Sequence, residues 1–332
     1  MKENIKKNKK HKKNDDLNKL INDYFVNKDI ILSYSDDVSY RFIDVINKID
    51  VTKFKMPVKE FDVVIAGGGL KGYYNFGACE ILKKMIKNNQ IKIRYYTGVS
   101  SGAYVALFTL LDISLQAIRN MYEFGRLNTH KHDLNKILSK ICEHILPDNV
   151  HELLNGKLKV LISKLTLKGL KPVIVDNFKS KEHLIKVLNA SSFIPLITTS
   201  EYNGIEIDNN KYFDGAFTNN TPVIIKHDFP QLLFNTSSVV YSSLYSFSIK
   251  DSNPELLIVR GAIDMEKFIL SFEKKDTEIK NIPIEWIPAE NNIIKGNNLL
   301  IKIILNIYLF SSLTFGTFLN LINKNILNKI IK

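Results

Sequence analysis

The stretch Tyr96-Thr97-Gly98-Val99-Ser100-Ser101-Gly102 lies between a predicted strand and a predicted helix. Its Gly-x-Ser-x-Gly pattern is typical of a sharp strand-to-helix turn, where glycines allow the two elements to approach closely. Such a turn holds Ser100 in a strained conformation with its hydroxyl outside the sheet. The following helix brings free N–H groups and partial positive charge to the same place. A serine in such a turn is placed as a nucleophile for acyl transfer, and an ordinary loop with the same glycine spacing is the other interpretation of this stretch.

A glycine-rich loop lies upstream of this stretch. The apolar run at 61–66 predicts a buried parallel strand, and it leads into Gly67-Gly68-Gly69-Leu70-Lys71-Gly72. The glycine spacing also fits the fingerprint of dinucleotide-binding loops, which requires an acidic residue about twenty positions later. No Asp or Glu lies between Glu80 and Asp112. We therefore favour a loop whose backbone N–H groups bind an oxyanion.

Strands and helices are expected to alternate around these motifs. Helices over 73–88 and 103–111 surround a strand at 91–96. This order predicts an α/β fold, a three-layer α/β/α sandwich with a central, mainly parallel sheet. Helices are expected over 114–155, with breaks at Gly125, Pro147 and Gly156. Further strands are expected at 159–167, 172–178, 202–207, 211–213, 255–259 and 282–287.

An aspartate follows the predicted strand at 211–213. It begins the sequence Asp214-Gly215-Ala216. An acid at the end of an apolar strand is placed like a catalytic carboxylate at a sheet edge. A turn aspartate that caps a loop would give the same pattern, so the residues alone leave both interpretations open.

Four blocks together resemble the patatin-like phospholipase family. The resemblance covers about residues 61–222, and the blocks occur in the family's order. They are Gly67-Gly68-Gly69-Leu70-Lys71-Gly72, Gly98-Val99-Ser100-Ser101-Gly102, Ala190-Ser191 with Pro195, and Asp214-Gly215-Ala216 with Asn220 and Pro222.

The resemblance implies a Ser-Asp catalytic dyad in a lipid acyl hydrolase. The enzyme would cleave fatty-acyl esters of phospholipids or lysophospholipids through an acyl-enzyme. The alternatives are a catalytically silent lipid-binding module of the same fold and a neutral-lipid (triacylglycerol) lipase. The implied site consists of the catalytic Ser100 and Asp214, an oxyanion hole of Gly67, Gly68, Gly69, Lys71 and Gly72, the elbow glycines Gly98 and Gly102, and the motif residues Gly215 and Ala216.

A Ser-Asp-His triad is the competing arrangement. The only histidine after Asp214 is His227, thirteen residues on and beside Asp228 in a polar stretch. We favour a surface or core role for His227. No metal or organic cofactor is implied, and we interpret His130, His132 and Asp133 as a polar loop.

The composition favours a folded protein of the cell interior. Of the 332 residues, 45% are hydrophobic, which is enough for a substantial core. Cys79 and Cys142 provide no disulfide framework, and no apolar run at the N-terminus resembles a signal peptide. We expect an intracellular protein, either cytoplasmic or peripherally associated with membranes.

Positive charge is concentrated at the two ends. Of the net charge of +12, residues 1–16 carry +4 and the residues after Glu290 carry +5, which leaves +3 for residues 17–290. Such lysines favour peripheral contact with anionic membranes. Because aromatic and basic residues are not interleaved, we do not expect nucleic acid as a partner.

The chain divides into four predicted parts. We expect a disordered basic tail at 1–16, a helical extension at 17–60, the catalytic core at 61–222 and a C-terminal extension at 223–332 that completes the domain. The last part includes an apolar helix at 299–327, within which residues 303–322 carry no charge. That helix could pack in the domain, lie in a membrane interface or, less favoured because of its polar residues, serve as a tail anchor.

Overall fold

A computed structural model of the chain describes residues 16–23, 41–222, 229–236, 253–272 and 284–287. The basic tail, except for Asp16, and the apolar helix at 299–327 lie outside these residues. The division of the chain into four parts therefore stays a prediction. Among the helices that the structure describes, none is both long and apolar enough to cross a bilayer.

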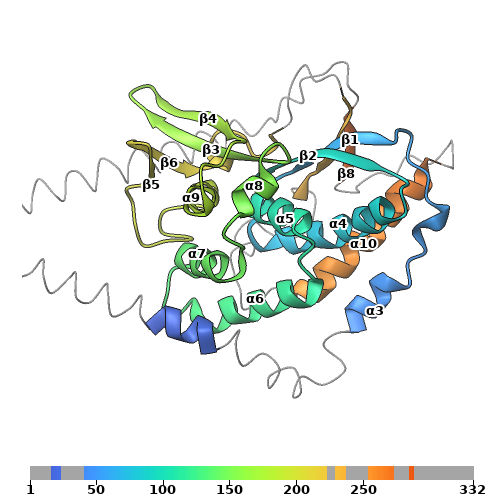
Figure 1. Cartoon of the computed structure of the whole chain (residues 1–332), viewed down its shortest axis with the longest axis horizontal. Coiled ribbons are helices and arrows are strands. Elements are labelled where there is room, and N and C mark those ends of the chain that lie inside the picture. The colour runs from blue at the N-terminus through green and yellow to red at the C-terminus, as the bar shows by residue number, and fades with distance from the viewer. Residues whose placement is uncertain (1–15, 24–40, 223–228, 237–252, 273–283, 288–332) are drawn as a thin grey trace, which may run out of the picture.

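An eight-stranded mixed sheet forms the centre of the fold (Figure 1). Its strands β3, β2, β1 and β7 are neighbours in that order, and each of these pairs is parallel. Strands β4, β6, β5 and β8 are added in antiparallel pairs. The strands are β1 Glu60–Ile65, β2 Lys92–Val99, β3 Leu158–Thr166, β4 Gly169–Val175, β5 Ile205–Ile207, β6 Asn210–Asp214, β7 Gln231–Phe234 and β8 Ile284–Ile287.

Helices flank the sheet and complete the predicted α/β sandwich, so this prediction is confirmed. Helix α5 packs directly on β2 and β3, and α9 packs on β3, β5 and β6. Figure 1 shows α6 and α7 farther from the sheet than α5. Besides a helix at 16–23, the helices are α3 Arg41–Asn47, α4 Gly72–Lys87, α5 Ser101–Leu110, α6 Leu115–Asn128, α7 Leu134–Ile145, α8 Val150–Leu154, α9 Lys181–Ser191 and α10 Pro254–Ser271.

Strand β3 brings β2 and β6 together. Its first half pairs with β2 and its second half with β6, while β4 pairs along the opposite edge. Since a strand has only two edges, β2 and β6 must meet on the same edge of β3. Val99 lies opposite Leu161, and Asp214 lies opposite Ile162. The last residue of β2 and the last residue of β6 are therefore neighbours.

Two sequence-based expectations about elements are wrong. The expected strand at 255–259 is part of α10, which begins after Asn253 accepts a hydrogen bond from the N–H of Leu256 at 2.9 Å. A short apolar run fits a buried helix face as well as a strand, and here it faces α4. The expected break at Gly125 is also absent, because α6 continues through that residue to Asn128.

Candidate active site

Ser100 occupies the turn between β2 and α5 in a strained conformation. Its φ of 54° and ψ of −129° are rare for a residue with a side chain. The turn depends on two glycines. A Cβ atom on Gly98 would lie 2.5 Å from the carbonyl oxygen of Gly102, and one on Gly102 would lie 2.3 Å from that of Ile65. The structure thus places the expected elbow residues in a tight strand-to-helix turn.

The carboxylate of Asp214 is fully buried beside this turn. Its Oδ1 accepts a hydrogen bond from the N–H of Ala216 at 2.8 Å, and Oδ2 has no hydrogen-bond partner among the described residues. A Cβ on Gly215 would lie 2.3 Å from the carbonyl oxygen of Leu161, so this position also requires glycine. Strand β6 thus ends at Asp214, and Oδ1 of this residue caps the short turn Gly215–Phe217 that follows.

Burial raises the pKa of Asp214 to about 7, and the N–H of Ala216 and the hydroxyl of Ser100 act in the opposite direction. The cause is desolvation, which disfavours the charged carboxylate. An ordinary aspartate is a weak base near neutral pH. A carboxylate with a pKa near 7 is matched to proton transfer there.

Ser191 fixes the turn through two hydrogen bonds, a role that no local sequence pattern predicted. Its hydroxyl oxygen accepts a hydrogen bond from the N–H of Ser100 at 2.9 Å. The same hydroxyl donates to the carbonyl oxygen of Leu161 at 2.7 Å. The Ala190-Ser191 block was part of the family resemblance, but nothing in its local pattern indicated a contact across 91 positions of the chain.

The glycine-rich loop passes close to Ser100. A Cβ on Gly67 would lie 3.1 Å from the Cβ of Ser100. Two side chains hold the Gly67 carbonyl oxygen: Asn220 Nδ2 donates to it at 3.2 Å, and Thr236 Oγ1 at 3.1 Å. Thr236 follows β7 and belongs to no recognisable motif, so no local pattern distinguishes it from other threonines of the chain.

The loop's N–H groups lie near the start of α5. The Gly68 N–H donates to Ser101 Oγ at 3.1 Å, so this hydroxyl must release it before the amide can bind another acceptor. Gly69 has a φ of 57°, which a residue with a side chain would adopt only under strain. A Cβ on Gly72 would lie 3.0 Å from Ser101 Oγ. Lys71 is buried, and this burial lowers the pKa of its ammonium group.

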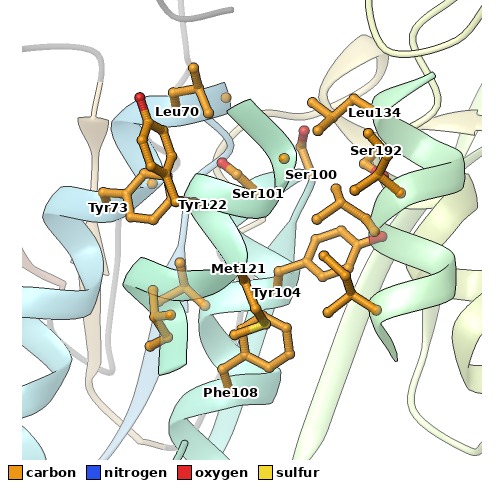
Figure 2. A pocket seen from close by; sticks show the side chains of 18 of the residues that line it. Leu70, Tyr73, Ser100, Ser101, Tyr104, Phe108, Met121, Tyr122, Leu134 and Ser192 are labelled. Carbon is orange, nitrogen blue, oxygen red and sulfur yellow. The ribbon is translucent and has the colours of Figure 1, made fainter. Parts of the chain in front are cut away.

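An apolar cavity of about 120 Å³ begins at Ser100 and Ser101. Figure 2 shows both hydroxyls at one end of the cavity, with the rings of Tyr104 and Phe108 farther along the same helix. Helices α4, α5, α6 and α7 contribute most of the lining. Such a space excludes water and accepts a hydrocarbon chain.

Two other expectations concern metal ligands and a triad histidine. Within the described part of the chain, no three His, Cys, Asp or Glu side chains are grouped so that they could hold a metal ion. His227 lies outside the described residues, so its role is not tested.

The fold and the site define an α/β protein with a serine elbow, a buried carboxylate at the adjoining strand end and an apolar cavity beside both. The chain belongs to the patatin-like phospholipase family, whose sequence pattern it matches over residues 63–225. This confirms the predicted resemblance.

Curated relatives carry both phospholipase and acyltransferase names. Human patatin-like phospholipase domain-containing protein 4 is 30% identical over 50% of this chain and 68% of its own length. Mouse 1-acylglycerol-3-phosphate O-acyltransferase Pnpla3 is 27% identical over 51% of this chain and 42% of its own. Human omega-hydroxyceramide transacylase is 27% identical over 50% of this chain and 32% of its own length. The chain thus spans between about a third and two thirds of the length of these relatives.

Proposed function

We propose that the protein is a serine esterase that hydrolyses fatty-acyl esters of phospholipids or lysophospholipids with a Ser100-Asp214 dyad. One observation carries the proposal. The register of β3 brings a buried carboxylate, whose Oδ2 lacks a hydrogen-bond partner among the described residues, to the strained serine at the end of β2. Capping of the following turn uses only Oδ1, so the buried and unpartnered Oδ2, which is costly to keep, supports a further role for this carboxylate.

In the proposed first step, Ser100 Oγ attacks the ester carbonyl while its proton passes to Asp214. The negative charge moves to the carbonyl oxygen. The N–H groups of Gly68 and Gly69, together with the N-terminal end of α5, stabilise this oxyanion. Each such donor contributes about 3 kcal/mol to transition-state stability in comparable sites. The tetrahedral intermediate collapses, Asp214 returns the proton to the leaving alcohol, and the acyl group remains on Ser100.

In the second step, an acceptor removes the acyl group from Ser100. Asp214 takes a proton from water as the water attacks, and the fatty acid leaves with the Ser100 hydroxyl restored. An alcohol of another lipid would use the same chemistry and yield a new ester. The names of the mouse acyltransferase and the human transacylase favour acyl transfer as a second candidate function.

Products from phosphatidylcholine vesicles would distinguish these outcomes. The protein is incubated with vesicles whose acyl chain is labelled, with and without monoacylglycerol as an acceptor. Free labelled fatty acid supports hydrolysis, and labelled diacylglycerol supports transfer. If the folded protein gives neither product but cleaves triacylglycerol emulsions, it is a neutral-lipid lipase. If it cleaves no ester at all, the catalytic proposal fails and the silent lipid-binding module replaces it.

A further inference from the structure

An apolar loop projects beside the cavity. It connects α9 to β5 and has the sequence Ile194-Pro195-Leu196-Ile197-Thr198-Thr199. The side chains of Leu196 and Ile197 are 53% and 50% exposed, and Tyr202 follows at 47%. Three large apolar side chains are thus exposed within seven positions of the chain, whereas exposed apolar residues on protein surfaces are commonly single.

The loop is tied to the cavity wall. Thr198 lines the cavity, and its carbonyl oxygen accepts a hydrogen bond from the N–H of Asn135, another lining residue, at 3.0 Å. Ser200 Oγ donates to Asp133 Oδ2 at 2.9 Å, just before α7 begins. The exposed apolar group is thereby held next to the space that leads to Ser100.

Four backbone N–H groups of the loop have hydrogen-bond partners within the loop. The N–H groups of Leu196, Ile197 and Thr198 donate to carbonyl oxygens of Thr199 and Ile194 at 2.8 to 3.2 Å, and the N–H of Ile194 donates to Thr198 Oγ1 at 2.9 Å. A segment that enters lipid must pair its backbone groups internally, because hydrocarbon offers them no partner. The N–H groups of Ile194, Leu196, Ile197 and Thr198 meet that requirement.

Leu196 has a backbone conformation and a solvent exposure that both cost free energy in water. Its φ of 65° lies in the left-handed region, where a residue with a side chain is strained, and half of its apolar surface faces solvent. Glycine or asparagine would relieve the strain and avoid the exposure. The conformation therefore makes physical sense if the side chain has an apolar partner outside the chain.

We propose that residues 194–199 insert into the surface of a lipid bilayer and hold the cavity against it, so that a lipid acyl chain enters without crossing water. The inference rests on the proposed lipid substrate. The carboxylates of Asp133 and Glu201 beside the loop share one lysine partner, Lys136, at 3.2 and 3.5 Å. Apolar insertion of this kind does not require anionic lipid.

Tryptophan fluorescence tests the insertion without any need for catalysis. The chain contains one tryptophan, Trp286, which is replaced by Phe as a dark background. Ile197→Trp and the control Leu167→Trp are then mixed with phosphatidylcholine vesicles. Leu167 is the matched control because it is fully exposed at the β3–β4 turn. A blue shift for Ile197→Trp alone supports insertion. No shift at Ile197→Trp, or no vesicle binding, overturns the proposal.

Hydrolysis adds a second readout that separates this proposal from the catalytic one. The double variant Leu196→Glu/Ile197→Glu should lose about ten-fold or more of its activity on phosphatidylcholine vesicles and keep its rate on soluble p-nitrophenyl butyrate. Leu167→Glu should retain both rates. Equal vesicle rates for the double variant and wild type contradict insertion. A wild type that cleaves neither substrate refutes the catalytic proposal, while the fluorescence result still decides the role of the loop.

Discussion

At the scale of residues, Ser100 and Asp214 meet because β3 pairs with both β2 and β6. They are far apart in the sequence, and only the register places their strand ends together. The hydroxyl of Ser191 accepts a hydrogen bond from the N–H of Ser100, and the N–H of Ala216 donates one to Asp214 Oδ1. The second carboxylate oxygen is left for the proposed proton transfer.

The proposed base sets the pH dependence of the reaction. Asp214 must be ionised to accept the Ser100 proton, and its pKa is raised to about 7. We therefore expect kcat/KM to rise with pH and to level off above about 7. The measurement is a pH profile on a soluble ester. Asp214→Asn should lower kcat by about 10² to 10⁴ at the plateau, and a profile that levels off near pH 4 would contradict the assignment.

The same pKa makes a prediction about stability. Between its unfolded value of 3.8 and about 7, the folded protein retains a proton on Asp214 that the unfolded chain has lost. The wild type therefore loses stability as pH rises through this window. Asp214→Asn has no titratable carboxyl at this position. Its free energy of unfolding, relative to that of wild type, should therefore increase by on the order of 2 to 4 kcal/mol as pH rises across the window. Urea unfolding at both ends tests this, and a difference independent of pH argues against a raised pKa.

Ser191 provides a test of how the elbow is positioned. Ser191→Ala leaves the buried N–H of Ser100 and the carbonyl oxygen of Leu161 without these partners, which costs about 1 to 3 kcal/mol for each group. We expect kcat on a soluble ester to fall while KM changes little, because the nucleophile is misplaced. Ser139→Ala is the control, since the hydroxyl of Ser139 is outside the cavity lining and bonds within its own helix to Glu143 Oε1 at 3.4 Å. Equal kcat values for both variants would remove Ser191 from the site.

At the scale of elements, α4 and α10 pack through glycines. A Cβ on Gly77 would lie 1.7 Å from the carbonyl oxygen of Ile258, and one on Gly261 would lie 1.8 Å from that of Tyr74. Backbone therefore contacts backbone at this crossing, and α10 holds the helix that begins at the glycine-rich loop.

Substitution of these glycines tests the crossing. Gly77→Ala should force the helices apart and destabilise the fold by about 1 to 3 kcal/mol or more. Gly125→Ala is the matched control, because its Cβ would have nothing within 4 Å. In the middle of α6 it should stabilise the protein by about 0.5 to 1 kcal/mol. Thermal unfolding measures both, and equal melting temperatures would argue against the close packing.

Local patterns predicted the elements that lie near the motifs. The apolar run before the glycine loop is β1, and the Gly-x-Ser-x-Gly turn is found between β2 and α5. The apolar run at 255–259 was misread because burial by α4, not local periodicity, determines its helical form. Ser191 and Thr236 escaped prediction because their contacts depend on how distant elements pack. The motif at Asp214 fits either a catalytic carboxylate or a turn cap. Only the register of β3 brings this residue beside the end of β2.

At the scale of the whole molecule, helices α4 to α7 enclose most of the cavity that extends from Ser100. Gly125 is a buried residue of the cavity lining, and a Cβ atom added at this position would have no other atom within 4 Å. A larger side chain at this position would occupy the cavity.

Gly125→Leu therefore tests whether the cavity holds the acyl chain. We expect its rate on a long-chain p-nitrophenyl ester to fall by about ten-fold or more, while its rate on p-nitrophenyl acetate stays near wild type, since only the long chain competes with the new side chain. Gly125→Ala serves as the control for the loss of glycine. If both esters lose activity equally at an unchanged melting temperature, the chain lies elsewhere.

The proposed mechanism depends most directly on acylation of Ser100. Wild type, Ser100→Ala and Asp214→Asn are treated with a long-chain alkyl fluorophosphonate, and intact mass and peptide mapping locate the adduct. We predict one adduct on the Ser100 oxygen of wild type, none on Ser100→Ala and slower labelling of Asp214→Asn. An unlabelled, folded wild type, or an adduct that persists in Ser100→Ala, would contradict the role of Ser100 as the nucleophile.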